Sequence, residues 1–181
     1  MKKIISLLTL AVLFFNSVSA QDYNSLGGTI GIINLKARVQ YEHGLSNRST
    51  VGTQLTYYFV NWTGPKLEVF GRLYSKKNGI EEGFFIQGKL GYGNLSVLDE
   101  DIFYTETKRW STMGFGLAPG WKFMFSDKLG IETLLGLHFY SSPNYPINGY
   151  DDFYEELGED VGWFITTGLP IDFQLKLIYR L

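Results

Sequence analysis

The sequence predicts an all-β protein, an eight-stranded antiparallel up-and-down transmembrane β-barrel whose apolar face points outward. Three observations predict this fold class. Apolar and polar residues alternate along seven segments with a period of two residues, the period of a strand and not of a helix. Glycine occurs mainly among the polar positions of these segments, and short polar connections separate several of them.

The first 20 residues resemble a secretory signal peptide. Lys2 and Lys3 provide positive charge, residues 4–15 an apolar stretch, and residues 18–20 (Val-Ser-Ala) a small-residue cleavage pattern. We therefore expect a signal peptide at residues 1–20 and one outer-membrane β-barrel domain at residues 21–181.

The composition of the remaining chain excludes several classes of protein. Residues 21–181 hold 14 Lys and Arg against 18 Asp and Glu, which gives a net charge of −4. Such a chain lacks the clustered basic residues that bind phosphates, so we expect no nucleic-acid partner. Cysteine is absent, which excludes disulfides and thiolate chemistry. No run of 18 apolar residues follows the leader, so we expect no spanning helix.

The alternation defines the strands in order. Residues 22–31 show it poorly, with three glycines. We infer a strand there because single-chain bacterial barrels have an even number of strands, and because seven would leave an unpaired edge. The seven clear segments are close to the roughly 9–11 residues that a tilted strand needs to cross a bilayer. They are residues 33–41, 53–59, 67–73, 86–92, 113–125, 129–139 and 171–181.

The connections place the strands between two rims. Residues 44–50, 75–82 and 126–128 are short, polar and rich in turn residues, whereas residues 94–109 and 141–168 form long connections. Successive connections of an up-and-down barrel alternate between rims. The short turns and both ends of the barrel therefore share one rim, the short-turn rim. The long connections and residues 60–65 lie at the other, the long-loop rim.

Glycine and aromatic residues indicate which face is inside. A glycine on a solvated strand face costs roughly 0.5–1 kcal/mol, but in a narrow eight-stranded lumen it makes room for long side chains. The glycines concerned are Gly91, Gly114, Gly116, Gly120, Gly130 and Gly136. Aromatic residues of the apolar set near strand ends resemble the two girdles of membrane barrels, with ordinary aromatic usage in strands as the alternative. They are Phe59, Trp62, Trp110 and Phe139 at the long-loop rim, and Tyr41, Trp121, Phe123 and Tyr179 at the short-turn rim.

The polar positions then predict a lumen filled with charge. Buried charges must be paired, so we expect ion pairs and water that plug the lumen, and no open anion path, because eight strands leave no channel. We expect the surplus of basic residues to be relieved where Lys66 or Arg180 lies near a rim in water. The inward set is Lys36, Arg38, Glu42, Lys66, Glu68, Arg72, Lys89, Lys122, Glu132, Asp172, Lys176 and Arg180.

The two histidines are weak candidates for catalysis. His43 is expected in a solvated turn beside Glu42. His138 precedes Ser141 and Ser142, and a His beside a Ser can activate the hydroxyl, as a lipid-modifying enzyme would require. Parity turns His138 inward, however, away from acyl chains. We predict no catalytic residue, no cofactor site and no metal site, because two His without Cys offer few transition-metal ligands.

The two long connections contain ten of the 18 acidic residues. Residues 151–157 also read as a short helix, with acidic residues in its first turn, where the helix dipole favours them. A solvated, like-charged surface is the simpler interpretation, and weak divalent-cation binding is the alternative. The acidic residues are Asp99, Glu100, Asp101, Glu106, Asp151, Asp152, Glu155, Glu156, Glu159 and Asp160.

Several short motifs also resemble those of known proteins. They are residues 24–27 (Asn-Ser-Leu-Gly), 41–46 (Tyr-Glu-His-Gly-Leu-Ser), 48–50 (Arg-Ser-Thr), 71–74 (Gly-Arg-Leu-Tyr), 82–85 (Glu-Gly-Phe-Phe) and 179–181 (Tyr-Arg-Leu). With them the chain resembles the small eight-stranded outer-membrane barrels of Gram-negative bacteria, in particular an uncharacterised family of such barrels. This resemblance implies recognition by the outer-membrane assembly machinery and no catalytic residues. It departs from the usual aromatic last residue, since the chain ends in Leu181.

Together these features predict an integral protein of the cell outer membrane, secreted by its signal peptide. We expect a structural or surface-interaction role, no enzymatic activity, and a monomer in contact with the lipid bilayer and lipopolysaccharide. The alternatives are a soluble periplasmic lipid-binding barrel and an outer-membrane lipid-modifying enzyme.

Overall fold

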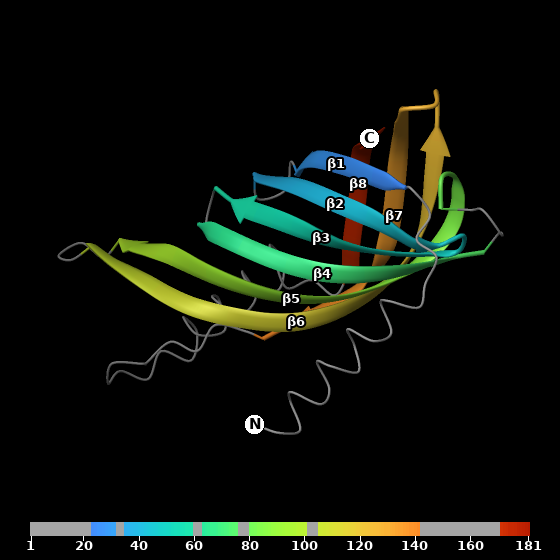
Figure 1. Ribbon diagram of the computed structural model, residues 1–181. Helices are drawn as coiled ribbons and strands as arrows, with labels where there is room; N and C mark the ends of the chain where they lie inside the picture. The colour runs from blue at the N-terminus through green and yellow to red at the C-terminus, as the bar shows by residue number, and fades with distance from the viewer. Residues whose placement is uncertain (1–22, 32–34, 60–62, 76–79, 101–104, 142–170) are drawn as a thin grey trace, which may run out of the picture.

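The computed structural model describes residues 23–31, 35–59, 63–75, 80–100, 105–141 and 171–181. They form eight antiparallel strands that close into a barrel in chain order (Figure 1), which confirms the expected fold. No helix among the described residues is long and apolar enough to cross a membrane. The expected signal peptide and the helix at residues 151–157 lie outside the described residues. The strands are β1 (Asn24–Gly31), β2 (Lys36–Ser46), β3 (Ser49–Tyr58), β4 (Gly64–Tyr74), β5 (Gly83–Glu100), β6 (Thr105–Met124), β7 (Leu129–Tyr140) and β8 (Ile171–Arg180).

The poorly patterned first segment is a strand, as inferred, and it closes the barrel. β1 pairs with β2 along its length and with β8 from Ser25 opposite Arg180 to Gly28 opposite Leu177. The Leu181 amide also donates a hydrogen bond to the Asn24 carbonyl at 2.9 Å. This pairing satisfies backbone groups that an open edge strand would leave free.

The chain order of the strands defines the two rims. The β2–β3, β4–β5 and β6–β7 connections and the ends of β1 and β8 that lie next to the termini share the short-turn rim. At this rim Gly83 begins β5 with φ of +127°, a backbone conformation that favours glycine. The β1–β2, β3–β4, β5–β6 and β7–β8 connections share the long-loop rim. The expected assignment of the rims therefore follows from the topology.

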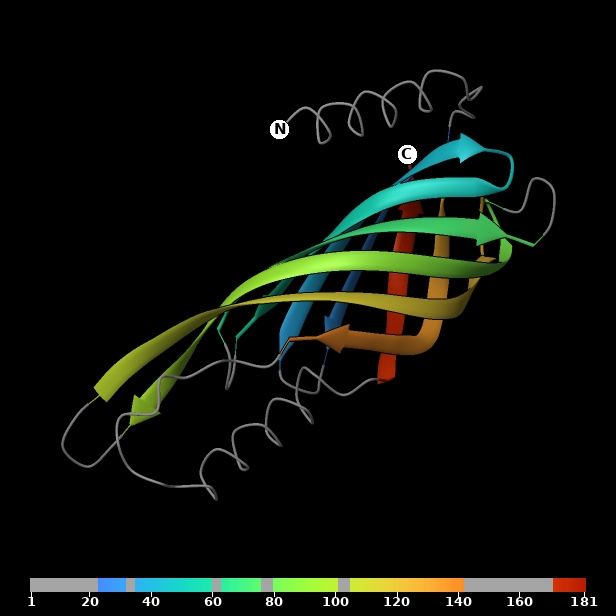
Figure 2. The ribbon, with the colours of Figure 1, turned by 90° about the horizontal axis from the view of Figure 1, so that it is seen from below.

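The expected long connection at residues 94–109 is wrong for most of its length. β5 and β6 stay paired as far as Glu100 opposite Thr105, so only four residues separate them. β4 leaves β5 earlier: its ladder ends at Lys66 opposite Gly93, and one further bridge joins Thr63 to Ser96. The two strands therefore continue past the barrel wall as a projecting hairpin (Figures 1 and 2). The two strands of a hairpin satisfy each other's backbone hydrogen-bonding groups, so the strands can continue through a polar stretch of sequence.

The barrel is apolar outside and polar inside. Every strand presents exposed large apolar side chains, among them Phe115 (58 % exposed) and Leu135 (56 % exposed). The positions between them are buried and contain most of the charged residues of the strands. The expected outward direction of the apolar face is therefore confirmed.

Candidate functional site: the charged lumen

Arg72 is the centre of the ion-pair network in the short-turn half of the lumen. Its two terminal nitrogens donate to the two carboxylate oxygens of Glu132, each at 2.7 Å, and Nη1 also donates to Glu42 at 2.9 Å. Its Nε donates to Gln87 at 2.8 Å. Paired N–H donors facing a carboxylate are the strong, directional form of this interaction. We call Glu42, Arg72, Lys122, Glu132 and Lys176 the Arg72 cluster.

Two lysines complete the Arg72 cluster, and neutral acceptors accommodate its one surplus positive charge. The Lys122 Nζ donates to Glu42 at 2.9 Å, to the Tyr23 hydroxyl at 2.7 Å and to the Ile80 carbonyl at 3.1 Å. Burial raises the pKa of the Tyr23 phenol, so this hydroxyl stays neutral when it accepts the bond. Lys176 donates in the same way to Glu132 at 3.1 Å and to the Gln40 side-chain oxygen.

A second group of charges lies nearer the long-loop rim. The Glu68 carboxylate accepts hydrogen bonds from Gln54 at 2.6 Å and from the Tyr140 hydroxyl at 2.7 Å, and it forms an ion pair with Lys89 at 3.0 Å. Lys89 also bonds to Asp172, joining the two carboxylates. Arg38 approaches Asp172, and Lys66 approaches Glu68, each at an N–O distance of 3.6 Å, which is longer than a hydrogen bond. We call Arg38, Lys66, Glu68, Lys89 and Asp172 the Asp172 cluster.

Strand register explains some of these contacts directly. Glu132 lies opposite Lys176 in the β7–β8 pair and opposite Lys122 in the β6–β7 pair, so one carboxylate lies between two lysines. Gln54 lies opposite Glu68 in the β3–β4 pair. Facing residues of antiparallel strands have Cβ atoms about 4.5–5.5 Å apart, close enough for such pairs.

Glycines provide the space that the longer side chains occupy. A Cβ on Gly116 would lie 2.7 Å from the Lys89 Cε, and one on Gly114 would collide with the Tyr140 ring. A Cβ on Gly120 would collide with the Phe85 ring. The Arg72 guanidinium lies over this ring, with its central carbon 4.4 Å from the ring centroid. The expectation that inward glycines make room in the lumen is therefore confirmed at these positions.

The expected inward set is largely confirmed. Ten of its twelve members are buried, and only Lys36 and Arg180 are partly exposed. Arg180 lies at the short-turn rim and pairs with Glu81 at 2.8 Å, as a residue in contact with water can. The same expectation for Lys66 is wrong. Lys66 is 3 % exposed, and its ammonium group lies 4.2 Å from the centroid of the Tyr140 ring, which covers it.

The uncharged partners of the network were not identified from the sequence. Gln40, Gln54 and Gln87 fall at the alternating polar positions but carry no charge, so they did not stand out. Tyr74 and Tyr140 appear apolar in such a pattern, yet their hydroxyls donate to Glu42 at 2.8 Å and to Glu68 at 2.7 Å. Their even positions, in phase with the inward set, were the signal that could have identified them.

The two histidines have different surroundings. His43 lies within β2, not in a turn, and its Nδ1 lies 2.8 Å from the Asn24 side-chain oxygen. His138 faces the lumen as parity predicted, with Nδ1 3.6 Å from Asp172. The Ser141 hydroxyl instead accepts from the Met113 amide at 3.1 Å. Ser142 lies outside the described residues.

The acidic residues of the long-loop rim are described only in part. Asp99 lies opposite Glu106 in the β5–β6 ladder. Within the described ranges, no three His, Asp or Glu side chains are grouped to hold a metal ion. The remaining acidic residues of the two connections, Asp101, Asp151, Asp152, Glu155, Glu156, Glu159 and Asp160, lie outside the described residues.

The outer surface confirms most of the expected aromatic girdles. The exposed members are Phe59 and Phe139 near the long-loop rim, and Tyr41, Trp121, Phe123 and Tyr179 near the other. The expectation for Trp110 is wrong, because it is 7 % exposed and packs inside the barrel with Tyr58 and Leu95. Its even number puts it in phase with the inward residues of β6. Trp62 lies outside the described residues.

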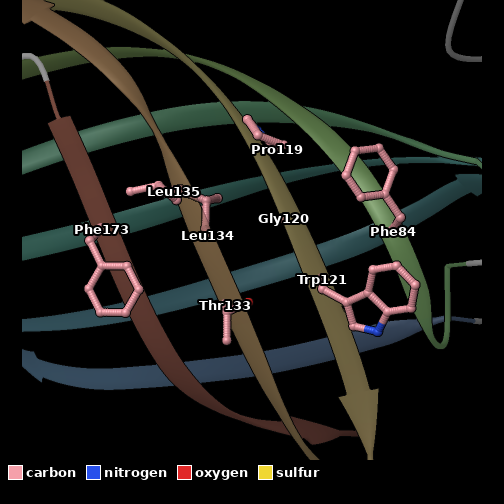
Figure 3. Close-up of a pocket in the computed structure, with 8 residues that line it drawn as sticks. All are labelled: Phe84, Pro119, Gly120, Trp121, Thr133, Leu134, Leu135 and Phe173. Carbon is pink, nitrogen blue, oxygen red and sulfur yellow. The ribbon is translucent and has the colours of Figure 1, made fainter.

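A shallow hollow of about 190 Å³ interrupts the apolar outer surface (Figure 3). It lies where Pro119 and Gly120 follow each other in β6. Proline has no N–H to donate to the ladder, and glycine has no side chain to fill the surface. The lining residues are Phe84, Pro119, Gly120, Trp121, Thr133, Leu134, Leu135 and Phe173. Since the Thr133 hydroxyl is its one reactive side-chain group, the hollow offers apolar contact and no constellation for catalysis.

Comparison with known proteins supports the fold. No family model matches the chain, and no curated protein matches its sequence. Among solved structures, the chain is similar to the N-terminal β-barrel domain of Pseudomonas aeruginosa OprF, with a TM-score of 0.54 and 8 % sequence identity. The match covers 90 % of this chain and 100 % of that domain. At this identity the similarity is one of fold alone.

Proposed function

We propose that this protein is an integral outer-membrane β-barrel, without enzymatic activity, that has a structural or surface-interaction role. The reversed polarity of the barrel is the observation that carries the proposal. Monomeric soluble proteins rarely expose apolar patches beyond a few hundred Å², whereas here every strand exposes large apolar side chains. A bilayer removes such surface from water, with a gain of about 25 cal/mol per Å².

The joined charges inside the barrel support a structural role over transport. Arg72, Lys122, Glu42 and Glu132 are fully buried and joined to one another across the short-turn half of the barrel. An eight-stranded barrel is only wide enough for its own side chains. Opening a path would separate buried charges, which is strongly unfavourable. In our proposal these charges and the Asp172 cluster close the lumen.

The projecting β5–β6 hairpin supports a surface role. It continues past the barrel wall at the long-loop rim, the rim from which the β7–β8 connection also leaves. Long connections of outer-membrane barrels face the cell exterior. We assign to this protein secretion by its signal peptide, delivery by the outer-membrane assembly machinery, and a monomeric state in contact with the lipid bilayer and lipopolysaccharide. The resemblance to an uncharacterised barrel family belongs to this proposal.

The two alternative functions fit the described residues less well. A soluble lipid-binding barrel needs an apolar lumen, but this lumen contains buried charges such as Lys89 and Asp172. A lipid-modifying enzyme needs a nucleophile near acyl chains. His138 instead lies inside the barrel, with its ring against that of Tyr140.

The proposal is tested by fractionating cell envelopes and comparing boiled and unboiled samples on a detergent gel. A membrane barrel sediments with the outer membrane, stays folded in unheated detergent and migrates at a different position after boiling. The boiled half of each sample is the internal control. Recovery in the soluble periplasmic fraction, with equal migration of both samples, contradicts the proposal.

A further inference from the structure

Among the described residues, the interior of the barrel holds more positive than negative charge. Four described carboxylates lie inside, and seven described basic side chains face the same lumen. The carboxylates are Glu42, Glu68, Glu132 and Asp172, and the basic residues are Lys36, Arg38, Lys66, Arg72, Lys89, Lys122 and Lys176. The Arg72 cluster has one surplus cation, which neutral oxygen acceptors bind at hydrogen-bond distance. The Asp172 cluster has three buried cations, Arg38, Lys66 and Lys89, and two carboxylates, and therefore a surplus of one.

The carboxylates of the Asp172 cluster are already engaged by other donors. Glu68 receives two hydrogen bonds, from Gln54 and Tyr140, and forms an ion pair with Lys89. Asp172 receives Lys89 and the Gln174 amide. Arg38 and Lys66 approach these two carboxylates only to 3.6 Å, beyond a normal hydrogen bond. Arg38 and Lys66 therefore lack the close oxygen acceptors that the surplus cation of the Arg72 cluster has.

Polar groups without a hydrogen-bond partner lie in the same part of the lumen. The Arg38 Nε, the Thr56 Oγ1 and both ring nitrogens of His138 are buried and have no hydrogen-bond partner among the described residues. Of the two His138 nitrogens, one is a donor in a neutral imidazole. Thr56 lies opposite Arg38 in the β2–β3 pair and opposite Lys66 in the β3–β4 pair, so these three side chains are neighbours at one level of the barrel. Arg38, Thr56 and His138 are each more than nine-tenths buried. A buried donor without an acceptor is costly, which makes this grouping unusual.

We propose that the Asp172 cluster binds one small monovalent anion of the halide class, held by Arg38, Thr56, Lys66 and His138. One such anion accepts from the unpartnered donors and reduces the surplus charge. The two carboxylates at the same level repel a larger, doubly charged oxyanion, which favours the small ion. Lys36 is only partly buried at the long-loop rim, so it marks the side from which the ion exchanges. This site goes beyond the structural role proposed above, which needs no bound ion.

The test uses the full chain, purified from membranes in detergent, and the thermal midpoint of its unfolding. The midpoint is measured while sodium bromide replaces sodium gluconate at constant ionic strength, which separates binding from screening. The wild-type midpoint rises with bromide and saturates, because a ligand that binds only the folded state stabilises it. Parallel bromide-soaked crystals should show an anomalous peak between Arg38 and His138. An equal midpoint in both salts, or a peak absent from the lumen, overturns the proposal.

Variants locate the site. Arg38→Gln should weaken the apparent bromide affinity by about tenfold or more, the effect of losing a charged hydrogen-bond donor. Lys128→Gln removes one positive charge from the exposed β6–β7 turn and should leave the affinity within about twofold, because water screens that charge. Equal bromide responses of the two variants overturn the assignment. If Arg38→Gln does not fold, Thr56→Val takes its place, because it removes the unpartnered hydroxyl and keeps the shape of the side chain. An unchanged bromide response of Thr56→Val counts against the site.

Discussion

Replacing Arg72 with methionine should destabilise the barrel more than any other single loss of a charge in the lumen. Arg72 is fully buried and donates to both carboxylates of the Arg72 cluster. Methionine keeps much of the volume and removes every donor. Glu42 then retains Lys122 as its cation, and Glu132 retains Lys176.

The expected cost is about 3–5 kcal/mol, the usual cost of removing one partner from a buried ion pair. The two carboxylates stay buried with less compensation, and this term dominates over the lost packing. Arg180→Met is the matched control, because Arg180 pairs with Glu81 at the partly exposed rim. Solvent weakens that pair, so its loss should cost about 0–1 kcal/mol.

The assay is equilibrium urea unfolding of the protein in phospholipid vesicles, with the folded fraction read from gel migration. A second variant tests the reason for the loss. Arg72→Met combined with Glu132→Gln neutralises one of the uncompensated carboxylates, so it should lose less than the sum of the two single variants. The expected coupling is roughly 0.5–3 kcal/mol. A cost of Arg72→Met no larger than that of Arg180→Met, or strict additivity of the pair, refutes the described network.

Two further predictions concern the faces and the rims of the barrel. Leu135→Arg should lower the free energy of unfolding in lipid by roughly 2–4 kcal/mol, the range for a charge on the lipid face. Spin labels at Leu135→Cys and Leu134→Cys check which side chain faces lipid. A lipid-soluble quencher that reaches the label at 134 and not the label at 135 contradicts the prediction. Because the native chain has no cysteine, Asp101→Cys and Asp127→Cys report the orientation, and an impermeant maleimide should label only Asp101→Cys on intact cells. Labelling of Asp127→Cys alone would reverse the assignment of the rims.

Local pattern was enough to find the strands, even though the whole sequence matches no family model. Successive side chains of a strand point to opposite faces, so the alternation can be recognised wherever one face is apolar. Glycine-rich β1 does not show a clear alternation, and only the need to close the barrel identified it. The β5–β6 hairpin was underestimated for the opposite reason. The outer part of this hairpin is held by backbone pairing between β5 and β6, which does not require an apolar face. The sequence therefore has no apolar alternation there by which the strands could be recognised.

The alternation also identified most of the buried charges, but not where each ends up. Lys66 and Arg180 read alike in the sequence, as basic residues near a strand end. Only the structure shows that aromatic rings cover Lys66, while Arg180 meets Glu81 in water. Trp110 was assigned outward by its residue type, although its position in the alternation predicted the inside.

The sequence by itself determined the strand order, the polarity of the two faces and the identity of nearly all the charges in the lumen. These properties depend on the period of two and on connection lengths, which are local. The tertiary structure alone decided which charges meet. Arg72 and Glu132 are 60 positions apart, and Lys89 and Asp172 are 83 apart. Such contacts cross the lumen between strands that are not neighbours, so they depend on the stagger and closure of all eight strands together, which no single segment encodes.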